Sequence, residues 1–124
     1  MTRRDLILVL VLLAVFWLVA IVGLPERLGA HPWWAVRSGI IGSLIGATVS
    51  VGVVFARLDG TWLRWLAGMG LVAAIASATF GKRAFAASLA EDTLAGRFWF
   101  FGWFAISACF FFFVFLILRH RIGR

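Results

Sequence analysis

The sequence predicts an all-α integral membrane protein: a four-transmembrane-helix bundle with a short interfacial helix before the last span. The chain of 124 residues is 64% hydrophobic and only 14% charged, whereas soluble domains have about 45–50% apolar and about 25% charged residues. Its charged residues also separate long uncharged runs. A soluble fold of this length could not bury so much apolar surface, so we expect lipid to surround most of these side chains.

The charged residues divide the chain into uncharged runs at 6–25, 38–56, 65–81 and 98–118. An α-helix needs about 20 apolar residues to cross the hydrocarbon core, and about 17–25 are tolerated. The third run is the shortest, but Arg64 before it can extend its side chain toward the head groups. We therefore expect one transmembrane domain, residues 1–124, with spans at about 6–25, 38–56, 62–81 and 98–118.

The first run follows the basic residues Arg3 and Arg4, as the apolar core of a signal peptide would. It is longer than the usual signal core of about 7–15 residues, and Leu28 stands where a cleavage site would need a small residue. We therefore expect a retained span. Because this run is rich in Leu and Val and poor in small residues, we place it at the periphery of the bundle.

The second and third spans each carry small residues at helical spacing on one face. In a membrane, helices associate where small residues let their backbones approach closely. Asp59-Gly60 is a turn dipeptide, so we expect the two spans to form a tight hairpin that packs through these faces. In the alternative, one of the faces contacts a second copy or a partner. The predicted packing residues are Gly39, Gly42, Ser43, Gly46, Ser50, Ala67, Gly70, Ala74 and Ala78.

Residues 82–97, which connect the third and fourth spans, hold five of the chain's seventeen charged residues. Placed on a helix, residues 84–95 have a polar side and an apolar side, which is typical of a short helix lying in the membrane interface. Gly81 can end the third span, and Gly96 can break the short helix before the fourth span. We interpret the segment as a solvated interfacial loop. The candidate polar residues for contact with a ligand or partner, here and at the start of the second span, are Arg37, Lys82, Arg83, Glu91 and Asp92.

The fourth run is dominated by Phe and Trp, with a narrow strip of small residues at Gly102, Ala105 and Cys109. We expect its bulky aromatic side chains to face lipid or to act as wedges between helices. A lipid-facing Phe112 would tolerate replacement by Leu.

No ionisable side chain lies within the four runs. Such groups are costly inside a membrane and mark ion or substrate paths. The chain has one cysteine, and both histidines lie outside the runs, so no spacing of metal ligands or of a nucleophile and base is apparent. We therefore expect no enzymatic activity, catalytic residue, metal or cofactor.

The formal net charge is +7, with the basic residues at the ends of the apolar runs. This placement favours contact with anionic head groups over nucleic acid. Four spans place both termini and the second connection on one side, where seven basic residues face five on the other. The excess favours both termini in the cytoplasm, in a bacterial inner membrane. The seven are Arg3, Arg4, Arg57, Arg64, Arg119, Arg121 and Arg124.

Two function classes fit these observations. The first is a non-enzymatic accessory, assembly or regulatory subunit that acts by helix packing in a larger membrane complex. The alternative is a small oligomeric channel or transporter for an ion or small solute, because one copy leaves little room for a path. In both cases the expected partners are the lipid bilayer and either another membrane protein or further copies of the chain.

Overall fold

The computed structural model describes residues 1–123, and its regular structure there consists of five helices. These are α1 (Arg3–Ile21), α2 (Leu24–Leu28), α3 (Ala35–Phe55), α4 (Thr61–Ala87) and α5 (Thr93–Ile122). All except α2 are long and apolar enough to cross a membrane. The prediction of an all-helical chain with four long apolar helices is confirmed.

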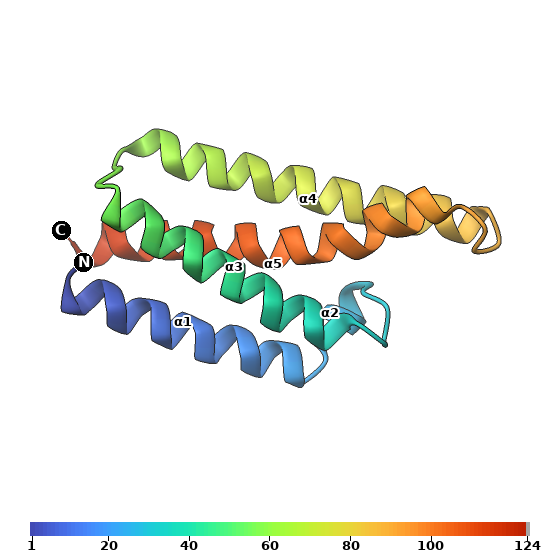
Figure 1. Cartoon of the computed structure of the whole chain (residues 1–124), viewed down its shortest axis with the longest axis horizontal. Coiled ribbons are helices and arrows are strands. Elements are labelled where there is room, and N and C mark those ends of the chain that lie inside the picture. Colours follow the sequence, from blue (N-terminus) through green and yellow to red (C-terminus); the bar gives the residue numbers. More distant parts are fainter. Residues whose placement is uncertain (124) are drawn as a thin grey trace.

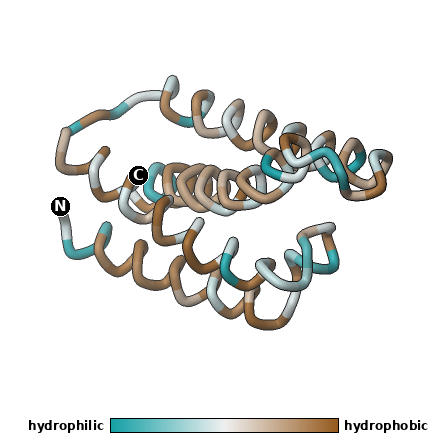
Figure 2. Tube along the Cα trace, turned by 45° about the vertical axis from the view of Figure 1, so that its right-hand side comes forward, coloured by the Kyte–Doolittle hydropathy of each residue, from teal (hydrophilic) through white to brown (hydrophobic). Residues whose placement is uncertain are grey.

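The four long helices run side by side in alternating directions (Figure 1). We call one end of the bundle the terminal end: it holds both termini and the connection between α3 and α4. The opposite end, the hairpin end, holds α2 and the connection between α4 and α5. Hydrophilic residues gather at these two ends, and the lengths of helix between them are mostly apolar (Figure 2).

The last helix, α5, is the centre of the bundle. It packs against α1, α3 and α4, whereas the backbones of α3 and α4 do not approach each other within the described chain. The prediction that the second and third spans pack on each other is therefore wrong. The small face of α4 lies on α5 instead, and the small face of α3 lies between α1 and α5.

Close backbone contact with α5 explains where the small residues are needed. A Cβ atom added to Gly42 of α3 would lie 2.5 Å from Ser107 Cβ of α5. On the other side of α5, a Cβ atom on Gly102 would lie 2.8 Å from Ala78 Cβ of α4. Small residues on α3 and α4 thus make room for a helix that carries many aromatic side chains.

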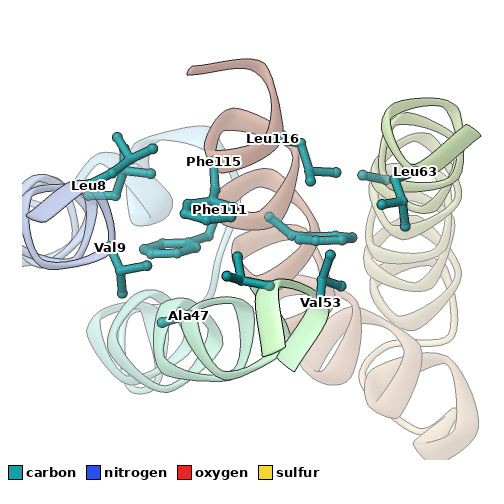
Figure 3. Close-up of a cluster of buried hydrophobic side chains, with 12 residues drawn as sticks. Leu8, Val9, Ala47, Val53, Leu63, Phe111, Phe115 and Leu116 are labelled. Carbon is teal, nitrogen blue, oxygen red and sulfur yellow. The ribbon is translucent and has the colours of Figure 1, made fainter. Parts of the chain in front are cut away.

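The core lies toward the terminal end, where side chains from all four long helices surround Phe111 and Phe115 (Figure 3). Both phenylalanines have an exposed fraction of 0%, and Phe112 has 9%. Phe112 therefore does not face lipid and instead fits the other expectation for these side chains, a wedge between helices, because the central position of α5 turns it inward. A leucine at position 112 would leave space in a packed core, which costs stability. Other aromatic residues of the same helix, such as Phe101 and Phe110, do face outward.

The predicted short helix at 84–95 is not present. Instead, α4 continues through Gly81 to Ala87, and α5 begins at Thr93. Gly81 does not end the helix and lies against α5: an added Cβ atom would be 2.6 Å from the Trp99 backbone nitrogen. The chain turns later, at Leu89 and Ala90, whose φ angles are 57° and 64°.

The short helix of this protein is α2, between the first two long helices. Gly23 precedes it with a φ of 88°, and Pro25 lies in its first turn, the position where proline is best tolerated. With 27 and 30 residues, α4 and α5 are also longer than α1 and α3, which have 19 and 21. At a rise of about 1.5 Å per residue, the α4–α5 pair extends beyond the other helices at the hairpin end (Figure 1).

Candidate functional site

The predicted packing residues of α3 are all buried between α1 and α5. Gly39 faces α1, where an added Cβ atom would lie 2.5 Å from Ala20 Cβ. Ser43 accepts a hydrogen bond from Trp17 Nε1 of α1 at 3.1 Å. Its hydroxyl donates to the Ile40 carbonyl oxygen at 2.8 Å, and Ser50 donates to the Gly46 carbonyl oxygen at 2.8 Å. The serine hydroxyls of this face are therefore satisfied by nearby groups.

The predicted packing residues of α4 line its contact with α5. Ala67, Ala74 and Ala78 are buried, and an added Cβ atom on Gly70 would lie 3.3 Å from Cys109 Sγ. The small face of α4 is thus directed at α5 and that of α3 at both α1 and α5, and the structure does not bring the two faces together.

Beside this contact, α4 and α5 leave a cavity of about 430 Å³ open to the side of the bundle, which we call the lateral groove. Its walls consist mainly of small residues and phenylalanines, and Arg97 is its one charged lining residue. Gly70 and Ala74, both predicted packing residues, belong to this lining. The other lining residues are Ala73, Ser77, Leu94, Phe98, Phe101, Gly102 and Ala105.

The predicted polar residues do not form one site. No hydrogen bond or ion pair links Arg37, Lys82, Arg83, Glu91 and Asp92 to one another within residues 1–123. Asp92 instead caps α5, because its Oδ1 accepts from the Ala95 backbone N–H at 3.0 Å. A capping oxygen of this kind satisfies a helix donor that would otherwise lack a partner.

Lys82 takes part in an aromatic cluster at the hairpin end. Its Nζ atom lies 6.0 Å from the centroid of the Trp99 ring, within the range of a cation–π contact. Trp99 Nε1 donates to the Gly29 carbonyl oxygen at 2.9 Å, and the ring also packs against His31 and Trp34. The cluster therefore joins the α2–α3 connection to the α4–α5 pair.

A second cavity, of about 450 Å³, opens at the terminal end, and sequence analysis did not identify it. We call it the terminal cavity. It is lined by the first turn of α1, the start of α4 and the last turns of α5. Its charged lining residues are Arg4, Asp5, Asp59, Arg64 and Arg119, and His120 also lines it.

An ion pair crosses the wall of the terminal cavity and joins the two ends of the chain. Arg119 Nε donates to Asp5 Oδ1 at 3.1 Å. Asp5 also completes a capping box with Thr2: each residue's side chain accepts from the backbone N–H of the other at 3.2 Å. In the sequence, Asp5 stands directly before the first uncharged run and Arg119 directly after the last. An even number of spans brings those positions to one side.

Residues 1–123 contain no group of three or more His, Cys, Asp or Glu side chains arranged to hold a metal ion. The single cysteine, Cys109, lies half-buried on α5 and faces Gly70.

Arg124, one of the seven basic residues counted on the terminal side, lies outside the described residues.

No protein-family model, curated protein or solved structure matches this chain.

Proposed function

We propose that this chain is a non-enzymatic accessory subunit of a larger membrane complex, and that it receives a transmembrane helix of its partner in the lateral groove. The observation that carries the proposal is the groove itself, an apolar recess walled by small residues of two helices. Small residues permit the close backbone approach that stabilises helix pairs in lipid.

The composition of the groove favours a helix as its occupant. Ala73 and Ser77 of α4 are the accessible small residues of its lining, whereas Gly70, Ala74 and Gly102 lie in the contact between α4 and α5. A partner helix with its own small residues could approach α4 at Ala73 and Ser77, which adds many dispersion contacts.

The filled centre of the bundle supports packing over conduction by a single copy. Phe111 and Phe115 have exposed fractions of 0% and lie where all four long helices meet. A conducting unit would therefore need a path between several copies. An oligomeric channel or transporter of this kind is the competing function.

The proposed location is a bacterial inner membrane with both termini in the cytoplasm. The supporting observations are the four long apolar helices and the larger number of basic residues on the terminal side. The ion pair between Asp5 and Arg119 supports a common side for the first and last helix ends.

The test compares three forms of the affinity-tagged full chain, purified in mild detergent with its co-purifying proteins quantified by mass spectrometry. One variant fills the groove, with Ala73→Leu and Ser77→Leu. The control, Ala76→Leu, adds the same side chain at an exposed position of α4 outside the groove.

We expect a specific membrane protein to co-purify with the parent and the control and to be lost from the groove variant, while all three melt at similar temperatures. A partner that stays bound to the groove variant would exclude the groove as its docking site. Saturable ion or solute flux through the pure chain in liposomes, with no partner, would instead favour the channel.

A further inference from the structure

We propose that the terminal cavity binds a phosphate group, presented either by the head group of an anionic phospholipid or by a soluble phosphate compound. This inference is independent of the proposed function, because the cavity and the lateral groove share no lining residue.

Three arginines from three different helices converge on the cavity: Arg4 of α1, Arg64 of α4 and Arg119 of α5. Their guanidinium groups retain most of their hydrogen-bonding capacity. Within residues 1–123, Arg119 uses Nε for Asp5, Arg64 uses one nitrogen for the Thr61 hydroxyl at 3.2 Å, and Arg4 makes no ion pair. Arginine is well suited to phosphate, because its planar group can donate two parallel hydrogen bonds.

The two carboxylates in the cavity do not cancel the positive charge of the three arginines. Asp5 is 6% exposed and is already compensated by Arg119 and the Thr2 backbone N–H. Asp59 Oδ1 accepts from the Gly60 backbone N–H at 2.7 Å. Three arginines against two aspartates leave a positive balance among these side chains.

The start of α4 borders the same cavity through Gly60, Leu63 and Arg64. Gly60 is the residue that precedes the helix, and no side chain caps it. The first N–H groups of an α-helix lack partners within the helix and carry a partial positive charge. An anion held by Arg4 and Arg64 would therefore also lie near the favourable end of the α4 dipole.

The floor of the cavity is apolar, which suits a phosphate attached to a larger molecule. Leu8, Leu63 and Leu116 are buried at its base. A volume of about 450 Å³ falls within the range of small-molecule sites, roughly 300–1,000 Å³. The site could thus hold a phosphate at the arginines and a glycerol group, or another organic group, on the leucines.

The experiment measures binding of phosphatidylglycerol, phosphatidylcholine and inorganic phosphate to the full chain in detergent by native mass spectrometry. The site variant is Arg4→Gln with Arg64→Gln. The control, Arg3→Gln with Arg121→Gln, removes the same charge at the same end of the bundle from residues outside the cavity lining. A third variant, Arg4→Lys with Arg64→Lys, keeps the charge and removes the planar donors.

We expect the parent to prefer phosphatidylglycerol over phosphatidylcholine. Hydrogen bonds to charged groups contribute about 1.5–3 kcal/mol each, so the site variant should bind at least about tenfold more weakly. The lysine variant should also bind more weakly, and the control should stay close to the parent. If inorganic phosphate competes fully with the lipid, the source is a soluble phosphate; if it does not, the source is the lipid head group.

Equal losses in the site variant and the control would overturn the proposal, because they would indicate diffuse attraction to the whole basic end. An absence of any preference for phosphatidylglycerol, together with no saturable binding of inorganic phosphate, would also overturn it. Thermal melting of each variant identifies a loss of folding. In that case the lysine variant, which retains all charges, decides the question.

Discussion

Gly46 and Gly52 both lie on α3, but Gly46 is packed against α5 and Gly52 faces open space. A Cβ atom on Gly46 would lie 2.6 Å from the Ala108 carbonyl oxygen and 2.8 Å from Phe111 Cβ, whereas a Cβ atom on Gly52 would have no atom within 4 Å. The first contact is with backbone of α5, which cannot move aside as a flexible side chain can. Adding one methyl group at Gly46 therefore tests how tightly α3 and α5 are packed.

We expect Gly46→Ala to lower the stability of the bundle by about 1–3 kcal/mol, the usual cost of overpacking. Gly52→Ala should be neutral or slightly stabilising, because Ala has the higher helix propensity by about 0.8–1 kcal/mol in water. Thermal melting of both variants in detergent measures the difference. Equal melting temperatures would show that α3 and α5 are not in close contact at Gly46.

At the scale of an element, the connection between α4 and α5 is held by local hydrogen bonds. Ser88 Oγ donates to the Phe85 carbonyl oxygen at 2.8 Å and accepts from the Asp92 backbone N–H at 2.9 Å. Asp92 then caps α5. These bonds make the turn well defined despite the left-handed backbone of Leu89 and Ala90.

We expect Asp92→Ala to destabilise the chain by about 0.5–2 kcal/mol, because the cap of α5 is lost. Asp92→Asn should retain most of the stability, since an amide oxygen can accept the same bond. Glu91→Gln is the matched control at the neighbouring exposed position, which makes no cap. Hydrogen exchange of the amides at 93–96 reports the effect. Unchanged protection in Asp92→Ala would contradict the capping role.

The sequence predicted which stretches become long helices, because that depends on local composition. It also located the close-packed faces, since Gly and Ala at helical spacing are read from one helix alone. It did not predict that both faces meet α5, because the choice of neighbour depends on how the Phe-rich surface of α5 fits between two other helices. The terminal cavity was missed for the same reason: Arg4, Arg64 and Arg119 are far apart in sequence and come together only when the helices assemble.

At the scale of the whole molecule, the alternating helices define two ends that should lie on opposite sides of a membrane (Figure 1). Reporter fusions at residues 30, 60, 90 and 124 should report outside, inside, outside and inside. The reason is the excess of basic residues at the terminal end, which favours the cytoplasm. Neighbouring fusions that report the same side would remove one span, and the fully inverted pattern would refute the cytoplasmic termini.

The central position of α5 determines when the bundle can assemble during synthesis. The ribosome makes α1, α3 and α4 before α5, yet α3 and α4 make no backbone contact of their own. Until α5 is made, α3 can pair with α1 through Gly39 and Ser43, but α4 has no neighbour among the long helices. We therefore expect assembly to be completed late: in a nascent chain that stalls before Thr93, the surfaces around Gly46 and Ala78 would stay uncovered.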